Sequence, residues 1–216
     1  MSESIQKLSP YLPEGTAPVI VDWIEKTNCQ FRVSKSRSSK FGDYRSPWKD
    51  KGHRISVNGD LNPFAFLVTT VHEFAHLKTW NEYANRVKPH GIAWKQNFKQ
   101  LMHPFLEGNV FPEDVRDAVR RYMKNPGASS CTDLTMFRTL KRYDLSRPES
   151  VTTVENLSDG ACFVLPNGRA FQKIQKVRKR FRCVELSSQR VYLFSPIAEV
   201  RLKVDHEAKE TEGHKI

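Results

Sequence analysis

Apolar residues recur at helical spacing near the start of the chain and again in its middle. The first set consists of Val19, Ile20, Trp23 and Ile24. Positions three or four apart share one face of a helix, so this set predicts a helix packed on other elements. A second helix is indicated after Asn62-Pro63, because Asn accepts hydrogen bonds from free backbone N–H groups and Pro at the first helical position has none to lose. Segment 64–77 is apolar nearly all round, which is typical of a helix buried inside a domain.

Shorter patterns surround this apolar helix. Residues 30–35 and 53–58 alternate between apolar and polar positions, so we expect two or three short strands before the helix. After it and a loop, helical spacing returns at 92–102 and at 112–122, the second with a proline and acidic residues in its first turn. Residues 133–143 fit either a short helix or an extended segment.

The period of the pattern changes to two in the last quarter of the chain. Short alternating segments with turn residues between them cover 161–165, 168–174, 180–186 and 190–194. They predict a small β module at 151–205, after a first domain at 1–145. Residues 206–216 are charged and unpatterned, and we expect them to be disordered. The fold class predicted is α+β.

One pentapeptide in the apolar helix carries candidate chemistry, His72-Glu73-Phe74-Ala75-His76. Positions i and i+4 of a helix share a face, so His72 and His76 can present two imidazole nitrogens to one ion. His90 is the candidate third ligand, and His103 competes with it. Three protein nitrogens on Zn²⁺ leave a position for water, from which Glu73 can take a proton. The pattern predicts a zinc hydrolase with one catalytic ion.

Composition limits the other possibilities. The chain has 216 residues, of which 38% are hydrophobic and 27% charged, as in ordinary globular proteins. It has no run of about 18 apolar residues, and its first residues lack the basic-then-apolar build of a secretory signal. We therefore expect a cytoplasmic protein with no membrane association. The four cysteines form no Cys-x-x-Cys pair and are expected to be reduced thiols, with Cys162 and Cys183 left open to meet in space.

Net charge suggests a polyanionic partner. Lys and Arg outnumber Asp and Glu by 35 to 24, and the formal charge of +11 attracts nucleic acid or acidic surfaces. The candidate DNA contacts are Lys35, Arg37 and Lys40 in one cluster and Lys176, Arg178, Lys179, Arg180 and Arg182 in another. Aromatic residues interleave with the second cluster at Phe171, Phe181, Tyr192 and Phe194. They suit base stacking, but their alternation favours the alternative that they form the core of the β module.

Two motifs together resemble a known family. The segment from Thr70 to Leu77, followed by His90-Gly91-Ile92-Ala93-Trp94, is similar to the SprT-like metallopeptidases, over roughly residues 15–125. The resemblance implies a compact zincin-like core of helix, short strands, HExxH helix and third-ligand helix. It also implies that His72, His76 and His90 bind zinc, that Glu73 is the general base, and that substrates are proteins associated with or crosslinked to DNA. Many members end in a four-cysteine zinc ribbon, whereas this β module keeps two cysteines, so a degenerate ribbon without its metal is expected.

The sequence therefore predicts a zinc metallopeptidase that acts on protein or peptide substrates, with DNA-associated proteins as the expected ones. Two alternatives stay open: a nucleic-acid-binding protein with a structural zinc and no proteolysis, and a zinc hydrolase that does not cut peptides. A fourth protein ligand would favour the structural zinc, and an open coordination position would count against it. The group that stabilises the oxyanion is also open, with Tyr44, Tyr83, His53 and several arginines as available types.

Overall fold

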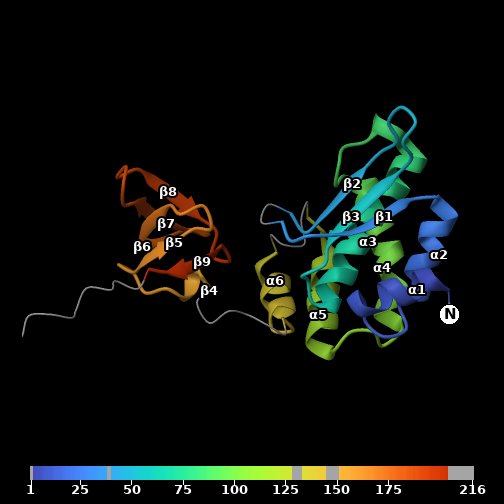
Figure 1. The fold of residues 1–216 in the computed structure, drawn as a ribbon. Helices are drawn as coiled ribbons and strands as arrows, with labels where there is room; N and C mark the ends of the chain where they lie inside the picture. Colours follow the sequence, from blue (N-terminus) through green and yellow to red (C-terminus); the bar gives the residue numbers. More distant parts are fainter. Residues whose placement is uncertain (1, 38–39, 128–132, 145–150, 204–216) are drawn as a thin grey trace, which may run out of the picture. The chain divides into compact units, whose positions relative to one another are not determined.

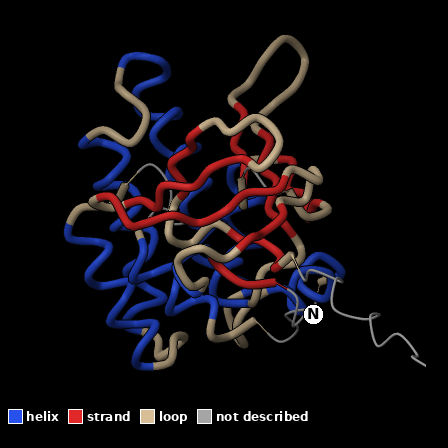
Figure 2. Tube along the Cα trace, turned by 90° about the vertical axis from the view of Figure 1, so that its left-hand side faces the viewer, coloured by secondary structure: helices blue, strands red, loops and turns tan. Residues whose placement is uncertain are grey.

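The chain folds into two compact units. The structure is a computed structural model that describes residues 2–37, 40–127, 133–144 and 151–203. The units are residues 1–145 and 146–216, and each is described by itself. Figure 2 shows helices and strands in the described chain. The long helices belong to the first unit, and the second consists mainly of strands and loops. The mixed α and β content agrees with the predicted α+β class. The tail predicted at 206–216 lies outside the described residues.

The N-terminal unit combines helices with one small sheet. Its helices are α1 (Glu3–Leu8), α2 (Ala17–Thr27), α3 (Pro63–Tyr83), α4 (Ile92–Glu107), α5 (Glu113–Lys124) and α6 (Leu134–Lys141), with 3-10 turns η1 (Ser9–Tyr11) and η2 (Ala84–Arg86). Its strands are β1 (Gln30–Ser34), β2 (Gly42–Arg45) and β3 (Arg54–Asn58). The sheet order is β1-β3-β2, with β1 parallel and β2 antiparallel to β3, so β2 is an edge strand. The predicted strands and helices are confirmed, and 133–143 proves to contain the helix α6.

Helix α3 forms the centre of this unit. It begins where the sequence predicts, because the Asn62 side chain accepts from the Ala65 N–H at 3.0 Å and Pro63 occupies the first helical position. The Asn62 amide also donates to the Leu140 carbonyl at 2.8 Å, which ties the start of α3 to α6. Most of the helix is buried. In Figure 1 the three strands lie across α3, and α4 lies alongside it. Polar side chains on α3 are thereby held among apolar neighbours.

The C-terminal unit is a six-stranded antiparallel sheet. Its strands are β4 (Val151–Thr153), β5 (Cys162–Val164), β6 (Ala170–Val177), β7 (Arg180–Glu185), β8 (Val191–Phe194) and β9 (Glu199–Leu202), with a 3-10 turn η4 (Val154–Asn156) after β4. The order is β4-β9-β5-β6-β7-β8. The four predicted strands are confirmed, and β4 and β9 are added. A bulge between Lys173 and Gln175 shifts the register of β6 on β7.

Aromatic residues fill the core of this sheet. Phe171 and Phe181 are buried, and Tyr192 and Phe194 pack against them. The core interpretation of these four aromatics is therefore confirmed over base stacking. Cys162 and Cys183 are both free thiols. They lie on opposite faces of the sheet, because Cys162 pairs with Gln172 whereas Cys183 pairs with its neighbour Lys173.

Within the described chain, no helix combines the length and apolar character needed to cross a lipid bilayer.

Candidate metal centre

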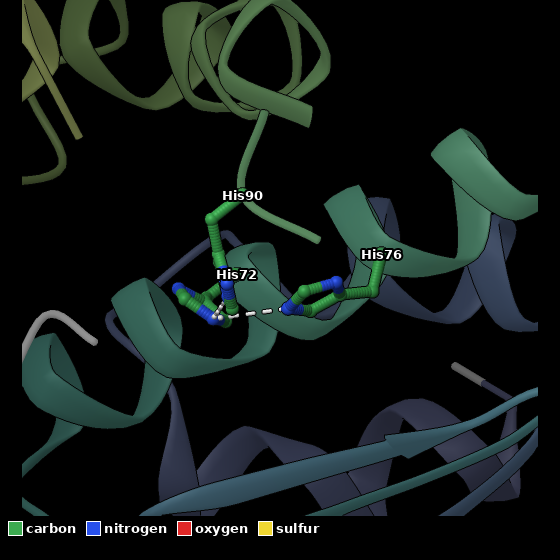
Figure 3. A group of neighbouring side chains, drawn as sticks. All are labelled: His72, His76 and His90. Atoms are coloured by element: carbon green, nitrogen blue, oxygen red, sulfur yellow. Dashed lines mark hydrogen bonds between the residues drawn. The ribbon is translucent and has the colours of Figure 1, made fainter. Parts of the chain in front are cut away.

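Two elements bring three histidines together. His72 and His76 lie on successive turns of α3, and His90 lies in the turn that leads into α4 (Figure 3). The Nε2 atom of His72 is 3.3 Å from the Nε2 atoms of both His76 and His90. His90 has a φ of 56°, an uncommon conformation for a residue with a side chain. The turn is closed by the Gly91 N–H, which donates to the Lys88 carbonyl at 3.0 Å. The local backbone is thus bent to aim His90 at α3.

The arrangement fits a metal ion better than it fits hydrogen bonding. A neutral imidazole carries one N–H, so the His72 Nε2 atom can donate to only one of its two neighbours. If the proton is on its Nδ1 atom instead, that buried N–H has no partner within the described structure. One cation between the three nitrogens would satisfy all of them, and ligand atoms from these residues lie within 4.8 Å of one another. The histidine cluster can therefore hold a metal ion.

Only three residues supply the cluster. No fourth His, Cys, Asp or Glu joins it among the residues that the structure describes. The competing candidate, His103, is on α4 with 69% of its side chain exposed, and its Nδ1 lies 3.7 Å from the Glu107 carboxylate. His103 is therefore excluded as the third ligand. Three ligands leave one tetrahedral position open, the pattern of catalytic rather than structural zinc sites.

Trp94 packs its ring against all three imidazole rings. Its fully buried ring lies 4.6 Å from the ring of His72, 5.4 Å from that of His76 and 4.7 Å from that of His90. Burial lowers the pKa of His72 to about 3 and the pKa of His76 to about 4, and it also lowers the pKa of His90. The imidazoles are therefore neutral near pH 7, and the neutral form binds metals.

Glu73 is held against the edge strand β2. Its carboxylate accepts a hydrogen bond from the backbone N–H of Tyr44. A Cβ atom at Gly42 would lie 2.5 Å from Glu73 Oε1 and 2.7 Å from Thr69 Cγ2, so only glycine leaves room for the carboxylate there. Burial, reinforced by the negative charge of Asp43, raises the pKa of Glu73 to about 8. The side chain of Glu73, which follows His72 in the sequence, is thus held in place by backbone contacts of β2.

A cleft of about 460 Å³ opens beside His76. Its walls include Tyr44, Trp48, Trp80 and the buried Trp94. The Tyr44 ring lies parallel to the His76 ring at 6.2 Å, and its hydroxyl is 2.9 Å from His53 Nδ1. Burial raises the pKa of Tyr44 well above its usual range, so the hydroxyl keeps its proton and can donate. Of the oxyanion donors considered from sequence, Tyr44 lines this cleft, whereas Tyr83 does not.

The two predicted DNA-binding clusters differ in what their cations contact. In the first cluster, Arg37 donates to Asn58 Oδ1 at 2.8 Å and to Ser56 Oγ at 3.1 Å, and Lys40 pairs with Asp43 at 2.6 Å. Arg37 therefore stabilises the position of β3, whereas Lys35 and Lys40 are both exposed. The second cluster follows the β6–β7 hairpin, and its five members are Lys176, Arg178, Lys179, Arg180 and Arg182. All five are exposed, and none pairs with a carboxylate in the part of the chain described here.

Comparison with known proteins adds nothing to this geometry. No model of a known protein family matches the chain, and neither does a curated protein or a solved structure. Function is therefore inferred from the site. Sequence reasoning missed the roles of Gly42 and of the Tyr44 backbone N–H, for which no sequence signal exists, because both depend on where β2 crosses α3. Trp94 carried a signal, since it follows His90 by four positions.

Proposed function

We propose that the chain is a zinc-dependent metallopeptidase of the SprT-like kind, with His72, His76 and His90 as the metal ligands. The observation that carries the proposal is the convergence of three imidazole nitrogens, with no fourth protein ligand among the described residues. The buried carboxyl group of Glu73 follows His72 directly in the sequence. The adjoining cleft supports the proposal, because His76 lies on its wall and clefts of this size are the usual binding sites for substrates. The zincin-like arrangement of the core belongs to the same proposal.

The side chains around the site have distinct tasks. Zinc bound to the three nitrogens would supply a Lewis acid that polarises a substrate carbonyl and acidifies water. Glu73 takes the proton of the attacking water on its carboxylate and passes it to the leaving amine. The Tyr44 N–H holds that carboxylate by a hydrogen bond, and the absence of a side chain at Gly42 leaves room for it. The Tyr44 hydroxyl donates to the oxyanion of the tetrahedral intermediate.

The alternative of a purely structural zinc is less well supported. Structural zinc is normally enclosed by four protein ligands, and the described residues provide three. A structural site also has no use for the buried carboxyl group of Glu73, because burying a polar group costs free energy unless it is compensated. The alternative of a non-peptidase hydrolase uses the same residues and differs only in substrate.

The proposed substrates are proteins on or near DNA. The five exposed cations of the β6–β7 hairpin can contact phosphates without any help from aromatic residues, which the module uses for its core. The family resemblance supplies the association with proteolysis. The peptidase proposal does not depend on this DNA proposal, since the metal centre and the hairpin belong to different units.

The decisive experiment compares Glu73→Gln with Glu107→Gln, a matched change at an exposed carboxylate on α4. Zinc content, casein cleavage and hydrolysis of small esters and amides are measured for both and for the unaltered chain. We expect Glu73→Gln to keep its zinc and to lose about 10²–10⁴-fold in peptide hydrolysis, the usual contribution of a general base. Full proteolysis by Glu73→Gln would refute the mechanism. Ester hydrolysis without proteolysis would favour the non-peptidase alternative.

DNA binding is tested through its salt dependence. Replacing the five hairpin cations by Gln should weaken DNA binding and reduce the slope of log K against log salt by about 0.9 for each phosphate that the variant no longer neutralises. A control that removes three cations elsewhere replaces Lys7, Lys26 and Lys78, which form helical ion pairs in the N-terminal unit, and its effect is compared per charge removed. Equal salt slopes for the hairpin variant and the unaltered chain would remove the role of the hairpin.

A further inference from the structure

The cleft beside His76 has an unusual distribution of charge. Three cationic residues line it, Arg45, Arg54 and Lys88, and no Asp or Glu is among its lining residues. A cleft lined by one sign of charge between low-dielectric walls concentrates ligands of the opposite sign. The walls here include the rings of Tyr44, Trp80 and Trp94, which carry no charge that would offset the cations. The cleft is therefore suited to an anionic group.

Two of these arginines face each other across the sheet. Arg45 on β2 is paired in register with Arg54 on β3. Like charges directly opposite each other destabilise a strand pair. Arg45 is compensated by Asp43, whose carboxylate lies 2.9 Å from the Arg45 Nε atom. Arg54 has no carboxylate partner within the described residues, so the repulsion is only half compensated by the protein itself.

Arg54 is also incompletely hydrogen-bonded. One of its terminal nitrogens donates to the Ser46 carbonyl at 3.1 Å, which fixes the direction of the guanidinium. Its Nε atom is buried and has no partner within the described structure. A buried donor without an acceptor costs free energy, and a planar guanidinium is well shaped for a carboxylate. Lys88, in the turn before His90, adds an exposed second cation at the same cleft.

We propose that this cleft is a substrate subsite for an acidic side chain, so that peptides with Asp or Glu close to the scissile bond are preferred. The inference rests on the proposed peptidase function, because His76 forms part of the same cleft. Arg54 binds the carboxylate through its guanidinium, and Lys88 adds attraction from the rim. An acidic peptide is favoured over nucleic acid as the occupant because His76, one of the proposed metal ligands, lines the cleft.

The first test uses activity. A zinc-loaded chain is incubated with a peptide library, and the residues around each cut are identified by mass spectrometry. We expect Glu to be enriched over Gln at one position by at least about tenfold, as for hydrogen bonds to charged groups. Arg54→Gln and Lys88→Gln should each reduce this ratio, and the double variant should abolish it. Lys99→Gln, a change on α4 away from the cleft, should keep the ratio.

The second test uses binding and needs no metal. Trp48 and Trp80 line the cleft, so tryptophan fluorescence of metal-free Glu73→Gln can follow binding of a blocked alanine pentapeptide with a central glutamate and of its glutamine counterpart. We expect saturable binding of the glutamate peptide, weakened at least about fivefold by Lys88→Gln and more by Arg54→Gln, since charge-assisted hydrogen bonds are the stronger ones. Lys88 is exposed, so its variant provides a test even if Arg54→Gln does not fold.

The outcomes separate the two proposals. Peptide cleavage without a preference for acids, together with equal binding of the two pentapeptides, would overturn the subsite and leave the peptidase intact. Absence of any peptide cleavage, together with preferential binding of the glutamate peptide, would overturn the peptidase and support the anion site. A fluorescence response to oligothymidylate but not to the glutamate peptide would overturn the acidic-peptide assignment.

Discussion

The two units of this protein bury ionisable side chains in opposite ways. In the C-terminal unit, the buried Lys173 donates to the Leu157 carbonyl at 2.5 Å, lies 3.4 Å from Asp159 and sits 4.1 Å above the Phe181 ring. Glu185 is paired with Arg169 at 2.7 Å and accepts from the Ser188 hydroxyl. In the N-terminal unit, the three histidine nitrogens point at one another, and hydrogen bonds cannot satisfy all of them.

This contrast separates structural from functional polar groups. A buried polar group that finds its partners within the protein stabilises one packing arrangement. A buried group that can form more hydrogen bonds than the protein offers it lowers the stability of the fold. Such a group is best explained by a ligand that supplies the missing partner. By this criterion the histidine cluster is a candidate site and Arg54 fits the anion subsite proposed above, whereas Lys173 and Glu185 stabilise the sheet itself.

The largest expected difference between the units is their response to zinc. All four tryptophans lie in the N-terminal unit, so tryptophan fluorescence reports its unfolding. Zinc at about 1,000 times its Kd should raise the free energy of unfolding of that unit by about 4 kcal/mol. Hydrogen exchange of 151–203, followed by mass spectrometry, should not change. His72→Ala should remove the stabilisation, and equal stabilisation of both units would contradict the assigned site.

A methyl group at Gly42 should disturb catalysis without disturbing metal binding. Gly42→Ala would place a Cβ atom 2.5 Å from Glu73 Oε1, and a displacement of about 1 Å at a catalytic group can cost about 10²-fold in rate. We expect kcat for peptide hydrolysis to fall by about that factor, with KM and zinc affinity little changed. Gly52→Ala is the control, because its Cβ would meet only the Asn28 carbonyl at 3.9 Å. A fall in zinc affinity would indicate a general structural defect instead.

Removing a satisfied cation should weaken the C-terminal unit alone. Lys173→Met keeps the apolar stem but leaves the Leu157 carbonyl without its donor, which costs about 1–3 kcal/mol when the acceptor is buried. Hydrogen exchange in β6 and β7 should accelerate, while the tryptophan-reported unfolding of the N-terminal unit stays the same. Greater stability of Lys173→Met would show that the protein does not satisfy this cation and that Lys173, like the histidines, belongs to a binding site.

Acid should loosen the same unit by a smaller amount. Hydrogen bonds from Arg169 and Ser188 lower the pKa of Glu185 from its usual value of 4.5 to about 2. A carboxyl whose pKa is depressed by folding stabilises the folded state above its unfolded pKa, and that contribution disappears as the pH falls from 4.5 to about 2. NMR signals of β7 and β8 should record this change. Arg169→Gln should flatten the dependence, and an unchanged profile would contradict the pairing.

Local features of this protein were determined by the sequence. The start of α3 follows from Asn62 and Pro63, and the shared face of His72 and His76 follows from their spacing of four residues. Capping and helical periodicity involve groups within one turn of each other, so they need no knowledge of the rest of the chain. The alternation in β6 and β7 likewise predicted that Phe171 and Phe181 form a core.

Only the tertiary structure decided which distant groups meet. His90 and His103 are equally available in the sequence, but packing of α4 on α3 directs His90 to the cluster and leaves His103 exposed. The contact of Gly42 with Glu73 and the cross-strand pairing of Arg45 with Arg54 depend on the position of β2. Such contacts join segments separated by loops, and interactions between residues close in the sequence do not determine them. They arise from the burial of the whole domain core, which is a property of the folded chain.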